Sequence, residues 1–464
     1  MSLTSAPVHE VAGQIARGEL HVSELVDAYL ARIAKHDEKL HAYVEVYEDD
    51  AREAAGAADH AIAAGHSVGP LHGIPVAVKD IVDIEGRITT GGSAAWLDRR
   101  SPVTATLVRR MVAAGMIVLG KTHTVEFAMG GWGTNQRMGT PWNPWDLAVH
   151  RTPGGSSAGT GVAVAGELAP WGIGTDTGGS VRIPAGWCGL AGLKTTVGRI
   201  SVHGVLPLSH TLDTPGPLAR CVEDAASLYE VLAGEDPHDP LTRGLPLAQP
   251  MRDLKRGIAG VRLAVMPEHE REGVDAELLA RFDEALACMV DLGADVVTLP
   301  ALPCSFAEFA ELTGRIIFAE GYSYVGDLCE DPTAPLDEDV RPRILTGKTY
   351  SARQYLDGLH HAKRIRAEFA ETLRGYDALV TPTMLTPAVP LNEVDQSGTP
   401  AGFTRVVNFL GRCALTVCNG YTSAGLPSGI QFICDPFNED MALRIGWAYE
   451  QANDWHTRSP NGLD

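Results

Sequence analysis

Hydrophobic and polar residues alternate along this chain in two patterns, which predict helices and short buried strands in turn. Near the start, Ser23 is expected to cap a helix, because serine accepts hydrogen bonds from the free amides of a first turn. The apolar residues that follow recur at helical spacing and would form one face of that helix: Leu25, Tyr29, Leu30 and Ile33.

The next elements bring a lysine to the end of a buried strand. An Ala-rich helix is expected over 48–64, and the short apolar run Ile74–Val78 is then predicted to form a strand that ends at Lys79. An amphipathic helix over 104–115 closes on a glycine, and a strand over 116–122 follows it directly.

The same alternation continues to the end of the chain and predicts an α/β protein with a mostly buried sheet. Further strands are expected at 262–266, 294–299, 377–383, 414–418 and 429–434, and further helices at 275–292, 306–330 and 352–374. A Gly-, Ser- and Pro-rich block over 153–216 lies between structured segments, so we expect a site there rather than a linker. A polar, Pro-rich segment over 235–260 is expected to separate two lobes of one compact fold.

Composition and charge narrow the class of protein. The 464 residues are 45% hydrophobic and 21% charged, as in ordinary globular proteins. The formal net charge of −20 repels nucleic acid and anionic membranes, so neither is expected as a partner. No secretion signal and no run of about 18 apolar residues is apparent, which favours a cytoplasmic protein. Eight scattered cysteines without a CxxC pair are expected to be reduced thiols and to form no zinc site.

The stretch PGGSSAGTG (153–161) sets two serines side by side, which suits a phosphate loop, a nucleophile loop or a flexible turn. Upstream, GMIVLGKT (115–122) matches the P-loop pattern, but Met-Ile-Val-Leu between its glycines is typical of a core strand. GSSAG also fits the α/β-hydrolase motif, with Ser157 as the nucleophile. A proline stands where that motif needs a strand, however, and nothing marks His203 or His210 as a general base.

A second Gly-rich stretch, GTDTGGS (174–180), follows a short apolar run. Two glycines before a serine let consecutive backbone N–H groups point at one spot, which is typical of an oxyanion hole beside a nucleophile. Taken alone, the stretch is also compatible with a tight turn.

Together, GIPVAVKD (73–80), PGGSSAGTG and GIGTDTGGSVRIPAGWCGLAGLKTT (172–196) resemble the amidase signature family, in the order typical of that family. The match is densest over 152–200 and extends loosely to CNGYTSAGLPSGIQFIC near the C-terminus. The resemblance implies one large domain over 1–464, with a mixed, mostly buried sheet covered by helices on both faces. We expect a signature core at about 70–220, a variable substrate-pocket lobe at about 235–400 and a return to the sheet at about 405–455.

The resemblance also implies a Ser–cis-Ser–Lys triad. Its members would be Lys79, Ser156 after a cis peptide bond, and the nucleophile Ser180, with Ser157 supporting Lys79 by a hydrogen bond. The oxyanion hole would be formed by the backbone N–H groups of Thr177, Gly178, Gly179 and Ser180. After GGSS this chain has Ala-Gly-Thr-Gly where the family often has Gly-Gly-Ser-Ala, a departure that touches no triad member.

A lysine serves as a base only when it is neutral, although its ordinary pKa is about 10.4. Burial at the end of a strand lowers that pKa, because the charged form loses its hydration. We therefore expect Lys79 to be buried, with its amine facing the two serines and Ser156 relaying the proton from Ser180.

The predicted reaction is hydrolysis of the C–N bond of linear carboxylic amides through a Ser180 acyl-enzyme, an EC 3.5.1-type amidase activity. Aryl amides, esters and carbamates (urethanes) are further candidate substrates, because they carry similar carbonyl groups. No metal or organic cofactor is implied. A small-molecule substrate and a monomer or homodimer are expected.

Two alternatives remain at this point. The A subunit of a glutamine-dependent amidotransferase would need partner subunits, and the segment VNFLGRCALTVCNGYTSAGLP (407–427) lacks the acidic residue expected for it. The net charge of −20 also fits the handling of tRNA poorly. A non-catalytic binding protein on the same fold is disfavoured by the intact triad.

Three of the eight tryptophans lie within 128–145, just before the serine loop. In the family that this chain resembles, the start of this segment borders the acyl side of the site. We predict that Ala128, Met129 and Trp132 line an apolar pocket that favours aromatic or other bulky amides and aryl carbamates. Trp142 and Trp145 are expected only to pack the segment onto the core.

Overall fold

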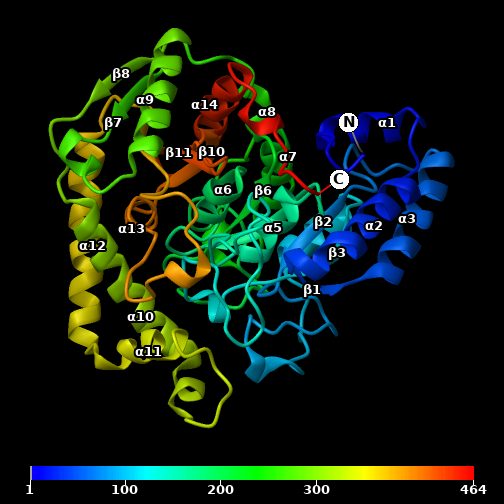
Figure 1. Ribbon diagram of the computed structural model, residues 1–464, viewed down its shortest axis with the longest axis horizontal. Helices are drawn as coiled ribbons and strands as arrows, with labels where there is room; N and C mark the ends of the chain where they lie inside the picture. The colour runs from blue at the N-terminus through cyan, green and yellow to red at the C-terminus, as the bar shows by residue number, and fades with distance from the viewer. Residues whose placement is uncertain (1–2, 464) are drawn as a thin grey trace.

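The computed structural model describes residues 3–463, and within them eleven strands form one mixed sheet in the order β1-β3-β2-β4-β6-β5-β10-β11-β9-β7-β8 (Figure 1). The strands are β1 Tyr43–Val46, β2 Pro75–Lys79, β3 Ile117–Thr122, β4 Trp171–Asp176, β5 Ala191–Lys194, β6 Thr214–Ala219, β7 Arg262–Val265, β8 Asp295–Thr298, β9 Ala378–Pro382, β10 Cys413–Tyr421 and β11 Pro427–Cys434. Two groups of parallel strands, β3-β2-β4 and β9-β7-β8, flank an antiparallel centre.

Helices cover both faces of this sheet, as expected. Helices α5 and α6 pack against one face, and α7, α9 and α14 against the other. Helices α1–α3 lie at the right of Figure 1, α12 at its left edge, and α10 and α11 at the lower left. The helices are α1 Val8–Ala16, α2 Val22–Leu40, α3 Glu48–Ala63, α4 Thr106–Ala113, α5 Ala158–Ala165, α6 Arg182–Cys188, α7 Val222–Leu232, α8 Pro250–Asp253, α9 Ala276–Asp291, α10 Phe306–Glu330, α11 Val340–Thr346, α12 Ala352–Thr372, α13 Arg405–Phe409 and α14 Glu439–Gln451.

The periodic segments match the elements predicted for them, with shifts of a few residues at their ends. The capping role of Ser23 was wrong: α2 begins one residue earlier, and His21 occupies the N-cap position. The Asp59 carboxylate of α3 accepts the backbone N–H groups of Val22 (2.6 Å) and Ser23 (3.0 Å). These first amides are therefore satisfied from another helix rather than by the Ser23 hydroxyl.

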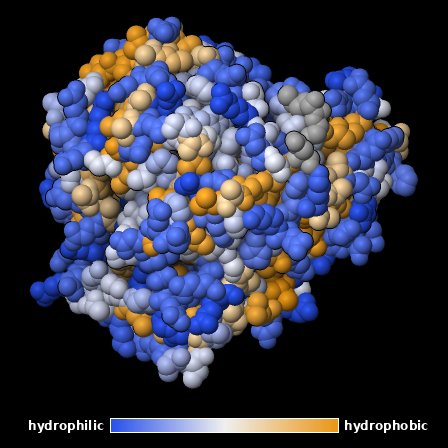
Figure 2. Space-filling view, in the orientation of Figure 1, coloured by the Kyte–Doolittle hydropathy of each residue, from blue (hydrophilic) through white to orange (hydrophobic). Residues whose placement is uncertain are grey.

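The sheet runs through all three expected parts of the chain, since β2–β6, β7–β9 and β10–β11 belong to it in turn. The division into a core, a lobe and a returning segment therefore stays a prediction. Within residues 3–463 no helix is long and apolar enough to cross a bilayer. Figure 2 shows a face covered mainly by hydrophilic residues, with apolar residues gathered in small groups.

Candidate active site

Strand β2 carries Lys79 into the interior, because all five of its residues are buried. The Lys79 amine donates to the Ser156 hydroxyl at 2.7 Å and to the Thr175 hydroxyl at 2.9 Å. Burial lowers the pKa of Lys79 to about 7, although the negative charges of Asp213 and Asp176 oppose the shift. A large fraction of this lysine is therefore neutral near neutral pH.

Ser156 follows a cis peptide bond to Gly155. The glycine is required by close packing, since a Cβ atom there would lie 2.6 Å from the Gly133 nitrogen. The Ser156 carbonyl accepts hydrogen bonds from the Val125 N–H (3.2 Å) and from the Thr124 hydroxyl (3.0 Å). These contacts hold the serine loop against the end of β3, with the Ser156 hydroxyl turned toward Lys79.

The turn after β4 is organised by the buried Asp176 carboxylate. It accepts the backbone N–H groups of Gly179 (2.8 Å) and Val181 (3.1 Å) and is paired with Arg182 at 2.9 Å. Burial opposes its charge, but Arg182 holds the pKa of Asp176 well below its ordinary value. Gly179 has φ +134°, and a Cβ atom there would meet the Thr404 hydroxyl at 2.2 Å, so only glycine fits.

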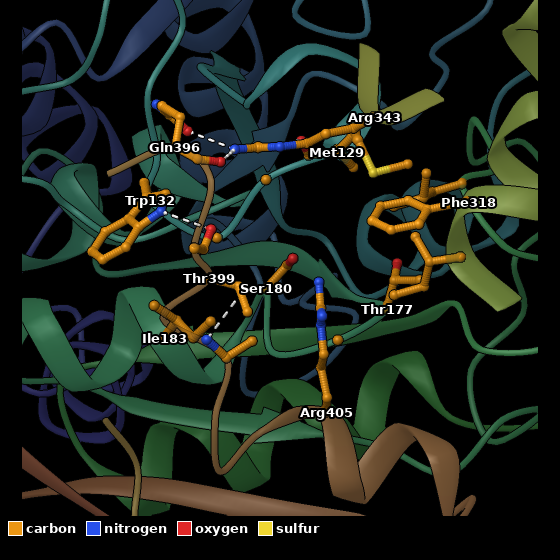
Figure 3. Close-up of a pocket in the computed structure, with 18 of the residues that line it drawn as sticks. Met129, Trp132, Thr177, Ser180, Ile183, Phe318, Arg343, Gln396, Thr399 and Arg405 are labelled. Atoms are coloured by element: carbon orange, nitrogen blue, oxygen red, sulfur yellow. Dashed lines mark hydrogen bonds between the residues drawn. The ribbon is translucent and has the colours of Figure 1, made fainter. Parts of the chain in front are cut away.

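Ser180 closes this turn and lines the main cavity, into which its hydroxyl points (Figure 3). Its carbonyl accepts the Ser157 backbone N–H at 3.3 Å, which joins the two Gly-rich segments. Within residues 3–463, the backbone N–H groups of Thr177, Gly178 and Ser180 have no acceptor. The Gly179 N–H differs from these three because it donates to the Asp176 carboxylate at 2.8 Å, and its place in the oxyanion hole stays a prediction.

The support of Lys79 also differs from the prediction. Ser157 makes no hydrogen bond to Lys79; its hydroxyl lies 3.3 Å from both the nitrogen and the carbonyl oxygen of Thr175. The direct second partner of the lysine is the Thr175 hydroxyl, which the sequence analysis missed. Thr175 lies within GTDTGGS, at the end of a buried strand, and that position could have drawn attention to it.

A cavity of about 450 Å³ opens at Ser180. The predicted residues Ala128, Met129 and Trp132 all line it. Trp132 stacks on Trp187 with ring centroids 5.7 Å apart. The apolar wall continues with Ile183, Leu208, Ile317 and Phe318.

The cavity wall also carries polar residues from segments far from the signature in sequence. Arg343 of α11, Gln396 and Arg405 of α13 border it, with Arg343 donating to the Gln396 side chain at 2.8 Å (Figure 3). None of the residues that line the cavity within the described chain is Asp or Glu. The cavity therefore joins an apolar side to a cationic one.

The other candidate segments have structural roles. GMIVLGKT forms the turn after α4 and strand β3. Trp142 and Trp145 donate to the Asp146 and Cys188 carbonyls as packing residues. His203 lies 3.4 Å from the Thr106 hydroxyl and His210 3.4 Å from Glu320, both away from Ser157.

The sequence predictions also concerned the cysteines and the possible metal ligands. All eight cysteines are free, and seven of them are buried. Among residues 3–463, no group of three His, Cys, Asp or Glu side chains is placed to hold a metal ion.

The mixed sheet, the cis-serine loop and the Gly-rich turn define an enzyme scaffold of the amidase signature class. The family model described as Amidase matches residues 24–443, and the chain therefore belongs to the amidase family. It is 36% identical over 487 aligned residues to a protein from Geobacter metallireducens that is named as the A subunit of glutamyl-tRNA(Gln) amidotransferase, with 99% of both chains covered.

Solved structures give the same family. The peptide amidase from Stenotrophomonas maltophilia is 30% identical, with a TM-score of 0.86 over 99% of each chain. A bacterial aryl acylamidase of the amidase signature family is 25% identical, with a TM-score of 0.89 over 98% of each chain.

Proposed function

We propose that this protein hydrolyses the C–N bond of linear amides, with Ser180 as nucleophile, Ser156 as proton relay and Lys79 as base. The observation that carries the proposal is the buried Lys79 amine, 2.7 Å from the Ser156 hydroxyl and bonded to hydroxyl groups rather than to a carboxylate. Ser180, whose carbonyl accepts the Ser157 N–H of the serine loop, borders a cavity of substrate size.

In the first half of the reaction, Ser180 Oγ bonds to the carbonyl carbon, its proton passes to Ser156, and the Ser156 proton passes to neutral Lys79. The C–N bond then breaks as a proton returns through Ser156 to the leaving nitrogen, which departs as a neutral amine. Water then attacks the acyl carbon and gives a proton to the same relay. The bond between the acyl carbon and Ser180 Oγ breaks as that proton returns to Oγ, which releases the acid and the free Ser180 hydroxyl.

The charge that develops on the carbonyl oxygen is stabilised in this scheme by the backbone N–H groups of Thr177, Gly178 and Ser180. They are fixed by the Asp176 network and need no reorganisation during the reaction. One such donor contributes on the order of 10²- to 10³-fold to kcat in serine hydrolases.

The apolar wall formed by Ala128, Met129 and Trp132 supports aromatic or bulky acyl groups as substrates, in an EC 3.5.1-type activity. Aryl amides, esters and aryl carbamates (urethanes) present the same carbonyl to Ser180.

A second candidate is the glutamine-hydrolysing component of an amidotransferase, which would pass ammonia to partner subunits. The name of a relative that is 36% identical over 99% of both chains favours it. The cavity favours the first candidate, hydrolysis of other linear amides. None of the described residues that line it is an Asp or Glu that could pair with the α-ammonium group of glutamine.

The experiment is a screen of the purified chain alone on glutamine, aliphatic amides, anilides and aryl carbamates, with ammonia or amine release as the readout. Ser180→Ala should abolish turnover of every substrate at an unchanged melting temperature. Glutamine as the best substrate would select the second candidate. A folded Ser180→Ala protein with more than a few per cent of the wild-type rate would remove both.

A further inference from the structure

A second cavity lies directly behind the catalytic one. It has a volume of about 340 Å³ and is bordered by helices α10 and α12. Phe318 and Arg405 are the residues of the described chain that line both cavities, so they form the partition between them. Arg405 shares the first cavity with Ser180, and its side chain extends toward that serine (Figure 3).

Arg405 lacks a counter-ion. One guanidinium nitrogen donates to the Ala310 carbonyl at 2.8 Å, and no carboxylate within residues 3–463 forms an ion pair with it. Arg343, across the catalytic cavity, differs because it is engaged by the carbonyl and side-chain oxygens of Gln396 and by the Met129 carbonyl. Arg405 therefore keeps most of its donor capacity for a ligand.

The surrounding backbone leaves space for this side chain. A Cβ atom on Gly178, in the turn that carries Ser180, would lie 3.4 Å from Arg405 Cγ. A Cβ atom on Gly314 of α10 would lie 3.4 Å from Arg405 Nη1. The arginine is thus held between two glycines, one of them adjacent to the expected oxyanion position.

The electrostatics of the cavity are unusual for a chain with a net charge of −20. Burial, followed by the charge of Arg343, lowers the pKa of Arg405 to about 10, so it is still cationic at neutral pH. The second cavity contains one acidic residue, Glu311, which is paired with Arg315 of the same helix at 2.5 Å. A poorly hydrated cation without a partner is costly, and a ligand carboxylate would offset that cost.

We propose that Arg405 is a specificity-determining residue that binds a carboxylate of the substrate where the two cavities meet. The preferred substrates are then linear amides that carry a carboxylate a few bonds from the scissile carbonyl. This inference rests on the proposed hydrolysis at Ser180. The inference also predicts that such amides are better substrates than glutamine. The catalytic cavity is lined by two arginines and by no described Asp or Glu that could pair with the ammonium group of glutamine.

The test compares primary amides of equal chain length. Glutaramate carries a carboxylate, pentanamide carries no charge, and glutamine carries a carboxylate and an ammonium group. The wild-type enzyme should have a kcat/KM for glutaramate about 10- to 100-fold above that for pentanamide, the range expected of one charge-assisted hydrogen bond. Glutamine should fall below glutaramate.

Variants assign this preference to one residue. Arg405→Gln should bring the glutaramate-to-pentanamide ratio close to one, mainly through KM, and Arg405→Lys should retain part of the preference. The ratio is measured within one protein sample, so it does not depend on the folded fraction. Arg364→Gln removes an equal charge from the exposed face of α12 and should keep the wild-type ratio.

A second pair of substrates shows which side of the scissile bond bears the carboxylate: 4-acetamidobenzoate against acetanilide places it on the amine side. If only this pair shows a preference for the carboxylate and Arg405→Gln loses it, the inference is supported as well. The carboxylate is then assigned to the leaving group. Hydrolysis of pentanamide and acetanilide with no carboxylate preference in either pair overturns the inference and leaves the proposed function standing. A preference that survives in Arg405→Gln overturns it as well. If no amide is hydrolysed, the proposed function itself fails.

Discussion

Two buried lysines on neighbouring strands have opposite surroundings. Lys79 ends β2, and Lys121 lies beside it on the parallel strand β3, opposite Val78 in the register. Both are completely buried. Lys121 is paired with the Asp80 carboxylate at 2.9 Å and with the Thr89 hydroxyl at 2.9 Å, whereas Lys79 contacts hydroxyl groups.

The comparison shows that the partner, rather than burial alone, decides what a buried lysine does. A carboxylate in contact compensates the ammonium charge and makes the lysine part of the framework. Hydroxyl groups satisfy the hydrogen bonds of the amine but add no negative charge, so the neutral form is accessible. Asp80 follows Lys79 directly in the chain, yet its carboxylate bonds to Lys121.

The largest difference is expected when each lysine loses its amine. Lys79→Met should lower kcat by about 10²- to 10⁴-fold, the usual contribution of a general base, with little loss of stability. Lys121→Met should instead destabilise the protein by about 3–5 kcal/mol, because it leaves Asp80 buried without its partner. Steady-state kinetics and urea unfolding of both variants measure the two effects.

The control for this pair is kcat per folded molecule. Lys121→Met, once corrected for its folded fraction, should be within a few-fold of the wild type. A catalytic loss in Lys121→Met as deep as that in Lys79→Met would mean that the two lysines do not have separate roles.

The next effect concerns the relay. Lys79→Ala and Ser156→Ala should each lower kcat strongly, and the double variant should be no slower than the slower single variant, because both residues act in one proton transfer. A double-mutant cycle on kcat measures this coupling. Losses that multiply would show that the two groups act independently.

Part of the candidate site's geometry could be predicted from sequence, because its residues lie in short contiguous motifs. Lys79, Ser156 and Ser180 each end or follow a recognisable stretch, and the structure brings the first two into contact. Thr175 was missed although it lies in the same motif as Ser180, because its role depends on which hydroxyl faces the amine in three dimensions. Spacing along the chain does not determine that orientation.

The elements that were missed show where local pattern fails. Strand β6, TPGPLA, contains two prolines and a glycine, which are typical of a turn, yet it pairs with β4 and β5 inside the sheet. Helix α5, AGTGVAVA, contains two glycines and is completely buried, so packing overrides its weak helix propensity. Arg343 and Arg405 reach the cavity from segments more than 160 residues beyond Ser180, and no motif connects them to it.

A smaller effect is expected from a substitution that gives Lys79 a carboxylate partner like that of Lys121. Thr175→Asp places a carboxylate beside Lys79 and should raise its pKa, so the rise of kcat with pH should move about one to two units to the alkaline side. Thr175→Asn keeps a polar group without charge and should move the profile much less. The midpoint of the pH profile is the readout, since it does not depend on the folded fraction; an unmoved midpoint would contradict the role given to Thr175.

The smallest effect concerns the apolar wall, which lies outside the polar network of Lys79. Trp132→Ala should weaken the binding of an anilide's transition state by about 1–3 kcal/mol, which appears as a lower kcat/KM. The loss should be smaller for a small aliphatic amide. Parallel assays of the two substrates measure the difference. Equal losses for both, or no loss for either, would show that Trp132 does not select the substrate.

The most direct test of the central claim, that neutral Lys79 activates Ser180, is the pH dependence of serine labelling. The rate of phosphonylation by a fluorophosphonate is followed by intact mass, and the labelled residue is identified by peptide mapping. Because burial lowers the pKa of Lys79 to about 7, labelling at Ser180 should rise as the pH passes through about 7 and level off above it. The rise should be absent in Lys79→Met. A flat profile in the wild type, or a label on another serine, would contradict the claim.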